Sequence, residues 1–261
     1  MPQFAPDRFG QLQGLPPTAP GQAVGLLGGS FNPPHAAHRQ ISDIVLKRLG
    51  LDQVWWLVTP GNPLKGRAEL APLSERLVLC RAMAKNPRIK VTAFERDLPT
   101  AHTAATLAFL KRRSPLVRFV WIMGADNLAN FHRWWRWREI LTMVPVVVVD
   151  RPGWRLKALA SKAAQAFAAS RVPETEARGL VAIPPPAWTF LTGPLSGVSS
   201  TDLRSKARER NQQVARKQQA AEIRAKPGVE GEAPAPRKPG LVVLDAPQLD
   251  RQHAALAGRD C

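Results

Sequence analysis

The stretch AVGLLGGSFNPPHAAH, residues 23–38, constrains the fold of this chain more than any other part of its sequence. The apolar run 24–27 predicts a buried strand, and the glycine pair 28–29 is expected to end that strand and to let backbone approach a ligand closely. The proline pair 33–34 excludes a helix from the turn that follows. An apolar periodicity then predicts a helix over residues 35–49. The result is a strand–loop–helix unit, which is typical of α/β folds.

The first turn of this predicted helix carries two imidazoles. His35 and His38 are three residues apart and therefore lie on one face, at a helix end where unpaired N–H groups create a partial positive charge. With the glycine loop they are typical of a polyphosphate site. Three simpler interpretations stay open: a tight turn, histidines with only a structural role, or half of a metal site, which has no Cys, Asp or Glu nearby to complete it.

The string GGSFNPPHAAH resembles the GG[TS]F-[DN]-P-x-H-x-G-H signature of the nucleotidyltransferase superfamily, whose members join a nucleotide to a phosphorylated acceptor. Ala37 departs from this signature, because a glycine usually precedes the second histidine. Its methyl group is compatible with a helix but narrows the approach to phosphate. The resemblance implies contacts with ATP and its phosphates for Gly28, Gly29, Ser30, Phe31, His35 and His38, with the two histidines in the catalytic role.

Length and composition limit the class of protein. The 261 residues, 44% of them hydrophobic, are enough for one large domain or one domain with appendages. Cys80 and Cys261 lie far apart and form no disulfide framework, so a reducing compartment is expected. No apolar run reaches membrane-spanning length, and the amino terminus lacks the pattern of a signal peptide. These features favour a cytoplasmic protein with no membrane partner.

The formal net charge of +17 has three interpretations: nucleic-acid binding, polyanionic small substrates, or a solvated basic surface. The densest basic patch, residues 204–216, has no aromatic residues between its charges, which disfavours a platform for single-stranded nucleic acid. Polyanionic small molecules therefore rank first as partners, and nucleic acid ranks well behind them.

A basic loop follows the second predicted strand, residues 53–59. Lys65 lies at the carboxyl end of that strand, where open α/β sheets bind ligands, although a solvated loop lysine is the commoner case. The string NPLK resembles the loop of bacterial nicotinate-mononucleotide adenylyltransferases, in which a lysine or arginine faces phosphate. This resemblance implies a catalytic role for Lys65.

A helix is predicted over residues 103–110, and Thr103 fits its N-cap position. The segment HTAATL resembles the [SY]-x-T-x-x-T-L segment of the same enzymes, in which a threonine contacts the nicotinate nucleotide. His102 stands where tyrosine is common. The resemblance implies nucleotide contact for Thr103.

A tryptophan-rich segment, GADNLANFHRWWRWREI, follows the strand predicted over residues 117–123. The spacing of Phe131, Trp134, Trp137 and Ile140 predicts one helix with some of its rings in the core. Core packing explains poorly why three tryptophans alternate with arginines here. Flat rings of this kind stack on flat heteroaromatic ligands.

The pattern G-x-D-x-L-x-x-F-x-x-W-x-x-W-x-x-I resembles that of bacterial nicotinate-mononucleotide adenylyltransferases. The resemblance implies that Trp134 stacks on the pyridine ring and that the main-chain N–H of Trp135 faces the nicotinate carboxylate. It also implies nucleotide contacts for Asp126, whose simpler role is to cap the following turn, and for Asn32 of the first loop.

The last motif is VSSTDLR, residues 198–204. Hydroxyls followed by an arginine one turn later describe a helix N-terminus, which alone is a weak signal. The string resembles the [IV]-S-[ST]-T-x-[IL]-R element that closes over the ATP triphosphate in the superfamily. The resemblance implies phosphate contacts for Ser199, Ser200 and Thr201 and a catalytic role for Arg204.

Strands alternate with helices along the chain, which predicts an α/β fold built on a doubly wound parallel sheet. The resemblance implies that this sheet is of the Rossmann-like nucleotidyltransferase type. Strands are expected at 24–27, 53–59, 89–94, 117–123 and 144–149, with a last short strand from 180–186 and then 188–191. Helices are expected at 35–49, 73–84, 103–110 and 156–170. A loose Pro/Gly-rich leader, 1–22, precedes the nucleotidyltransferase domain, 23–204. The basic tail, 205–261, is expected to be helical or disordered.

The five resembling segments together imply an enzyme of NAD biosynthesis that transfers the adenylyl group of ATP to nicotinate mononucleotide, giving nicotinate adenine dinucleotide and pyrophosphate. Mg²⁺ is expected through the ATP phosphates, with no metal-binding side chains of the protein's own. Three alternatives stay open: nicotinamide mononucleotide as acceptor, another adenylyl- or cytidylyltransferase that shares the first motif, or a catalytically impaired nucleic-acid-binding protein. A homo-oligomer is also left open.

Overall fold

A computed structural model describes residues 14–61, 70–193, 204–205, 209–210 and 212–214 of the chain. Its centre is a seven-stranded parallel sheet in the order β3-β2-β1-β4-β5-β7-β6. The strands are β1 (Ala23–Gly29), β2 (Gln53–Val58), β3 (Ile89–Thr92), β4 (Arg118–Gly124), β5 (Val146–Val149), β6 (Arg171–Val172) and β7 (Trp188–Leu191). The strand order reverses between β1 and β4, so the predicted doubly wound α/β fold is confirmed.

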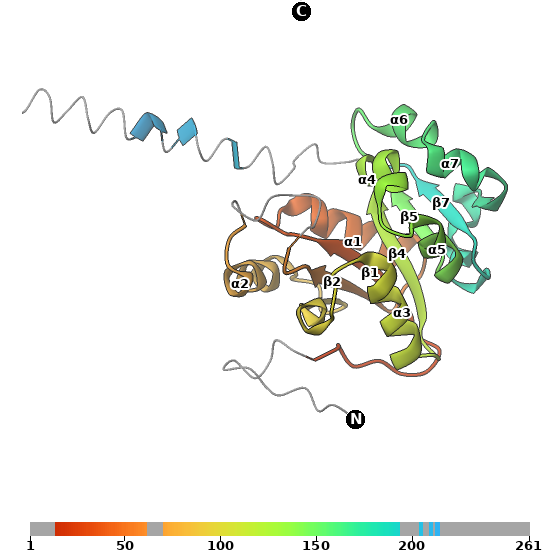
Figure 1. The fold of residues 1–261 in the computed structure, drawn as a ribbon, viewed down its shortest axis with the longest axis horizontal. Coiled ribbons are helices and arrows are strands. Elements are labelled where there is room, and N and C mark those ends of the chain that lie inside the picture. The colour runs from red at the N-terminus through yellow and green to blue at the C-terminus, as the bar shows by residue number, and fades with distance from the viewer. Residues whose placement is uncertain (1–13, 62–69, 194–203, 206–208, 211, 215–261) are drawn as a thin grey trace, which may run out of the picture. The chain divides into compact units, whose positions relative to one another are not determined.

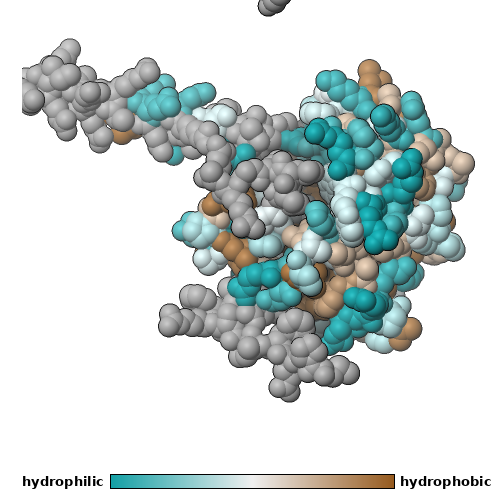
Figure 2. Space-filling model, in the orientation of Figure 1, coloured by the Kyte–Doolittle hydropathy of each residue, from teal (hydrophilic) through white to brown (hydrophobic). Residues whose placement is uncertain are grey.

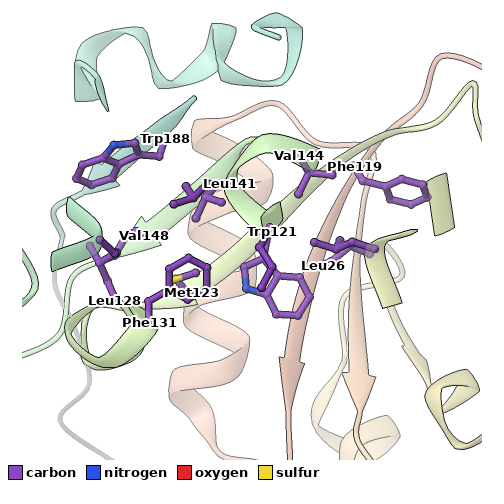
Figure 3. Close-up of a cluster of buried hydrophobic side chains, with 14 of the residues drawn as sticks. Leu26, Phe119, Trp121, Met123, Leu128, Phe131, Leu141, Val144, Val148 and Trp188 are labelled. Atoms are coloured by element: carbon purple, nitrogen blue, oxygen red, sulfur yellow. The ribbon is translucent and has the colours of Figure 1, made fainter. Parts of the chain in front are cut away.

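Helices cover both faces of this sheet (Figure 1). The α-helices are α1 (Ala36–Arg48), α2 (Leu73–Met83), α3 (Thr103–Arg113), α4 (Ala125–Asn130), α5 (Trp137–Met143), α6 (Arg155–Leu159) and α7 (Lys162–Ala166). The 3₁₀ segments are η2 (Phe94–Asp97), η3 (Phe131–Arg133), η4 (Ala168–Ser170) and η5 (Glu174–Ala182). Buried residues of α1, α2 and η5 pack on one face, and those of α3 to α7 pack on the other. Figure 3 shows the core of the second face, where aromatic and aliphatic side chains from β1, β4, α4 and α5 interdigitate.

The first strand is longer than predicted, because β1 continues through Gly28 and Gly29 instead of ending before them. Both glycines pair in register with β2. A Cβ atom at Gly28 would lie 2.7 Å from Cη2 of Trp121 on the neighbouring strand β4, so only glycine fits beneath that ring. Gly28 therefore allows the end of β1 to lie directly against the ring of Trp121.

The single helix predicted from the spacing of Phe131 to Ile140 is wrong. The segment forms α4, the 3₁₀ turn η3 and then α5, and Arg136 between them has a left-handed backbone with φ of 53°. Phe131 and Ile140 are buried as predicted, because the turn returns both side chains to the same core. The helix predicted over residues 156–170 is likewise divided into α6, α7 and η4, with Ser161 accepting a hydrogen bond from the N–H of Ala164 as the cap of α7.

Four smaller features differ from the predictions. Strand β3 ends at Thr92 and gives way to η2, and the two-residue strand β6 was not predicted. The last strand is confined to 188–191, because residues 180–182 end the 3₁₀ segment η5 and 183–186 form no strand. The N-cap of α3 is His102, so Thr103 is the first helical residue and not the cap. Strand β5, in contrast, lies inside the sheet with all four valines buried, as its apolar run predicted.

Part of the segment predicted as a leader lies against the domain. Leu15 packs on the core, and the carbonyls of Gly14 and Pro17 accept hydrogen bonds from Thr92 and Gln53. The boundary at residue 22, like that at residue 204, stays a prediction. Helices of the described part are all too short or too polar to cross a membrane. Figure 2 shows mainly hydrophilic side chains on the face in view, with hydrophobic ones in small scattered groups.

Candidate active site

The predicted site residues that the structure describes gather at the carboxyl edge of the sheet, around the reversal point between β1 and β4. Open α/β sheets bind ligands at this point, since the loops on its two sides diverge and leave a crevice. The glycine loop, residues 28–32, comprises the last two residues of β1 and the three that follow. Asp126 follows the end of β4, and Arg151 follows the end of β5. Lys65, Ser199, Ser200 and Thr201 lie outside the described residues.

The two imidazoles lie together at the start of α1. His35 is the N-cap, His38 is the third helical residue, and their ring centroids are 3.9 Å apart. The main-chain N–H of His35 donates to Nδ1 of His38 over 3.2 Å. Burial and the neighbouring His35 lower the pKa of His38 from 6.5 to about 3. His38 is therefore neutral at physiological pH and carries its proton on Nε2, which makes that atom a hydrogen-bond donor.

Two residues that the sequence analysis did not single out fix the first turn of α1. The hydroxyl of Ser42 donates to the His38 carbonyl over 2.8 Å and accepts from the indole N–H of Trp56 over 2.8 Å. Phe31 is 1% exposed, and its ring stacks on Trp56 at 5.1 Å and contacts His38 at 4.6 Å. Two sequence features could have indicated these residues: Ser42 comes one turn after His38, and Trp56 lies in a strand predicted to be buried.

Phe31 has a left-handed backbone, with φ of 46°. A bulky residue adopts this conformation only where its surroundings compensate the strain, which is on the order of 1–3 kcal/mol. Backbone of this kind can turn successive N–H groups to one side, and such groups bind anions. The loop geometry thus agrees with the predicted phosphate site at Gly28 to Phe31.

Asn32 connects this loop with distant parts of the chain. Its main-chain carbonyl accepts a 2.6 Å hydrogen bond from Nη1 of Arg204, and its side-chain oxygen accepts one from the N–H of Ala71 over 3.3 Å. Arg204 thus lies at the glycine loop although 172 residues separate it from Asn32. The structure therefore brings together Asn32, the histidine pair and Arg204, three of the predicted features.

Asp126, in the first turn of α4, forms a 2.6 Å ion pair with Nη1 of Arg151. A Cβ atom at Gly124 would lie 2.5 Å from the Asp126 carboxylate, so glycine at the end of β4 leaves room for this side chain. Arg151 also lies close enough to His38 for its charge to help lower the pKa of that imidazole. Sequence analysis missed Arg151, because its one signal, a position directly after an apolar strand, does not show which side chain it meets.

Removal of the Arg151 charge is expected to lower kcat/KM of the adenylyl transfer that the sequence motifs imply by about 10-fold. The reason is that Asp126 loses its partner and the site loses a cation near the histidines. Arg151→Met and Asp126→Asn should be combined in a double-mutant cycle, with steady-state kinetics as the measurement. We expect kcat/KM of the double variant to fall by a factor clearly smaller than the product of the factors for the two single variants. Fully multiplicative losses would show that the two side chains act independently.

The tryptophans occupy two environments. Trp134 is partly buried and meets Phe131 and Trp121 edge to face, with centroid distances of 5.2 and 6.4 Å. Trp135 is 48% exposed, stacks on His102 at 5.2 Å and has the Arg136 guanidinium 5.1 Å from its ring centroid. The segment thus meets the start of α3 through the contact between His102 and Trp135, which brings Thr103 near the tryptophans.

A buried carboxyl lies behind the start of α3. Glu95 is 5% exposed, and its Oε1 accepts a 2.7 Å hydrogen bond from the hydroxyl of Thr106. Burial raises the pKa of Glu95 from 4.5 to about 7. The folded protein therefore holds this proton over a pH range in which the unfolded chain releases it.

Glu95 is expected to make the protein less stable as pH rises from about 4.5 to about 7, by about 1.36 kcal/mol per pH unit for one proton. Glu95→Gln keeps an acceptor for Thr106 and removes the titration. Urea unfolding at several pH values should show the free energy of unfolding of the wild type falling relative to this variant across the window. His38 contributes an opposite slope in both proteins and cancels in the difference. A pH-independent difference would contradict the buried ionisable carboxyl.

The donor set favours phosphate over a protein-bound metal. In the described part of the chain, no three His, Cys, Asp or Glu side chains group closely enough to hold a metal ion. The described side chains at this edge are chiefly imidazole and guanidinium groups, which bind phosphate oxygens. A Mg²⁺ ion in this site would therefore fit as a partner of nucleotide phosphates, to which it binds while keeping several waters.

The sequence and the fold were compared with known proteins. Residues 26–206 match the family described as cytidylyltransferase-like. A probable nicotinate-nucleotide adenylyltransferase of Rhizobium meliloti is 58% identical over 70% of this chain and 97% of its own length. The corresponding protein of Methylorubrum extorquens is 57% identical over 70% of this chain and 99% of its own.

The fold is similar to that of a solved structure, the Plasmodium falciparum nicotinic acid mononucleotide adenylyltransferase complexed with NaAD. Its TM-score is 0.55 at 16% identity, over 70% of this chain and 83% of that one. At this identity the likeness supports the fold alone. The identity to the bacterial relatives, which spans nearly their full length, is far higher. The chain therefore belongs to the cytidylyltransferase-like family and, within it, to the nicotinate-nucleotide adenylyltransferases.

Proposed function

We propose that this chain transfers the adenylyl group of ATP to nicotinate mononucleotide, giving nicotinate adenine dinucleotide and pyrophosphate, as a cytoplasmic step of NAD biosynthesis. The observation that carries this proposal is the neutral His38, held with Nε2–H as a donor at a helix N-terminus beside the glycine loop and Arg204. Such an arrangement binds a polyphosphate through hydrogen bonds and charge without needing a protonated imidazole.

The reaction needs no covalent intermediate. A 5′-phosphate oxygen of nicotinate mononucleotide attacks the α-phosphorus of ATP in line; the new P–O bond forms as the bond to the bridging oxygen of the β-phosphate breaks, and pyrophosphate leaves. The attacking phosphate is already largely ionised at neutral pH, so no general base is required. Catalysis then consists of positioning and charge stabilisation.

The residues divide this work between them. His38 donates from Nε2 to a phosphate oxygen, and His35 contacts the neighbouring phosphate from the N-cap. Arg204, and Lys65 from its loop, stabilise the charge that develops on the leaving pyrophosphate. Mg²⁺ bound to the ATP phosphates supplies further neutralisation of this charge. Gly28 and Gly29, with the loop after them and the hydroxyls of residues 199–201, hold the triphosphate.

The acceptor nucleotide is proposed to lie against the tryptophan segment and the start of α3. Trp134 offers a ring to the pyridine, and the main-chain N–H of Trp135 is the proposed donor to the nicotinate carboxylate. Thr103, Asn32 and Asp126 contact the rest of the nucleotide. The contact between His102 and Trp135 supports this grouping, because it joins the start of α3 to the tryptophan segment.

The test is pyrophosphate release by the purified full chain with ATP and Mg²⁺, with three acceptors offered separately: nicotinate mononucleotide, nicotinamide mononucleotide and phosphopantetheine. We expect release with nicotinate mononucleotide and at least 10-fold less with the amide. Equal release with both mononucleotides would contradict the acid preference. If the folded protein releases no pyrophosphate with any of the three acceptors, the proposed function is contradicted.

A further inference from the structure

Arg76, in the first turn of α2, is buried to an extent unusual for its type. Only 1% of its surface is exposed, and no other lysine or arginine among the described residues is buried to a comparable degree. Burial of a charged side chain is costly unless its donors are satisfied. The hydrogen-bond partners of this guanidinium therefore show which groups offset the cost of its burial.

The guanidinium of Arg76 binds main-chain carbonyls of three separate segments. Nη1 donates to Ser30 over 2.7 Å and to Thr59 over 2.8 Å, and Nε donates to Ala71 over 2.9 Å. Ser30 belongs to the glycine loop, Thr59 directly follows β2, and Ala71 precedes α2. One side chain thus ties the glycine loop to two neighbouring points of the carboxyl edge.

The positive charge of Arg76 has no counter-ion in the described part of the protein. None of the described carboxylates forms an ion pair with it, and the ionisable group whose charge acts on its pKa is Cys80, one turn further along α2. Burial raises the pKa of the Cys80 thiol to about 12, so this group is neutral. Burial also lowers the pKa of Arg76 from its ordinary 12.5, but a guanidinium remains charged in proteins. The result is a fixed cation in contact with the glycine loop.

The contact with Ser30 lies directly before the strained residue of the loop. Phe31 has its left-handed φ of 46° one residue later, and its ring is held from the other side by Trp56. Fixing the Ser30 carbonyl restricts the peptide unit that enters Phe31. Arg76 and Trp56 therefore hold the same strained turn from its main chain and from its side chain.

We infer that Arg76 is a positioning residue for ATP binding: through the carbonyls of Ser30, Thr59 and Ala71 it fixes the phosphate-binding loop and sets against it a positive charge that no described carboxylate neutralises. This inference rests on the proposed function for the identity of the nucleotide. It adds a residue that belongs to none of the sequence motifs. The bound phosphates are attracted by this charge without touching the side chain.

The test compares Arg76→Lys and Arg76→Met with the wild type by calorimetric titration of ATP, without acceptor, together with thermal unfolding. Lysine keeps the charge but cannot span three carbonyls, and methionine removes both functions. We expect the Kd for ATP of the folded protein to rise about 10-fold with lysine and about 100-fold with methionine. Arg88→Lys and Arg88→Met are the matched controls, because exposed Arg88 donates to the Leu51 carbonyl at the opposite edge of the sheet; an unchanged Kd is expected.

A merely structural role predicts another result: a lower thermal midpoint and an unchanged Kd for ATP, which would overturn the inference. In the wild type, the Nε–H resonance of Arg76 provides a measurement that does not depend on how the variants fold. We expect slow exchange with solvent and a shift on saturation with ATP, and an unshifted resonance would also overturn the inference. ATP binding without adenylyl transfer to nicotinate mononucleotide would contradict the proposed acceptor alone and leave this test intact.

Discussion

Replacement of His38 by alanine is expected to lower kcat on the order of 100-fold or more while the protein stays folded. The reason is the fixed Nε2–H donor. The His35 main chain occupies Nδ1 of His38 over 3.2 Å, and burial keeps the ring neutral, so the remaining donor is aligned before any substrate arrives. Such a donor is most effective where negative charge grows in the transition state. Steady-state and single-turnover kinetics with ATP and nicotinate mononucleotide measure the loss.

The neutral state of His38 predicts the outcome of three measurements at varied pH. Its pKa of about 3 means that kcat should show no titration of this residue between pH 5 and 8, and that its ring proton resonances should not shift in this range. The folded pKa lies below the ordinary 6.5, so the unfolded chain binds this proton first as pH falls. The free energy of unfolding should therefore decrease from pH 6.5 downward by about 1.36 kcal/mol per unit, and His38→Ala should lack this component.

Arg39→Ala is the matched control for this variant. Arg39 is the next residue of the same helix, is exposed, and lies 3.9 Å from the Asp43 carboxylate. Its removal takes a charge from the first turns of α1 without touching the imidazoles, and turnover within about 2-fold of the wild type is expected. Wild-type turnover in His38→Ala would remove His38 from the mechanism, and titration of His38 near pH 6.5 would contradict its neutral tautomer.

The first strand, loop and helix could be predicted from the sequence because their determinants are local. An apolar run, two prolines and a helical periodicity each act over a few residues, and α1 begins at Ala36, one residue after the predicted start. The glycines of β1 could not be placed with the same accuracy. They look like strand breakers in isolation, but the ring of Trp121 on the neighbouring strand requires Gly28 inside the ladder.

Arg76 and Arg151 show why the remaining site residues escape sequence analysis. Neither belongs to a recognisable motif, and each owes its position to the strand order, which brings α2 and the end of β5 to the glycine loop and to Asp126. The partners of Arg76 are main-chain carbonyls, which carry no side-chain identity and leave no trace in the sequence. Only the three-dimensional structure reveals such contacts.

For the tryptophan segment, residues 124–140, the sequence predicted the buried positions correctly and the secondary structure wrongly. The spacing of Phe131 and Ile140 predicted core positions, and both are buried. The same spacing could not reveal the left-handed Arg136, because one residue with positive φ divides the helix while Phe131 and Ile140 both stay in the core. Periodicity thus identifies these core positions and misses the break between them.

Trp134→Ala is expected to raise the KM for nicotinate mononucleotide about 10- to 100-fold and to leave the KM for ATP within about 3-fold. Stacking of an aromatic side chain on a heteroaromatic ring contributes about 1–3 kcal/mol, which corresponds to that range. Trp134 also packs edge to face on Phe131 and Trp121, so the variant should lose stability as well. The diagnostic result is therefore the ratio of the two KM values and not the activity alone.

Trp137→Ala separates the two roles of these rings. Trp137 is partly buried like Trp134, and it packs on Phe131 and Phe167 in the same core with centroid distances of 6.2 and 6.0 Å. Its loss should therefore lower the free energy of unfolding by a comparable amount, about 3 kcal/mol, while both KM values stay near those of the wild type. If Trp134→Ala behaves in the same way, Trp134 is a core residue only, and the pyridine ring must stack elsewhere.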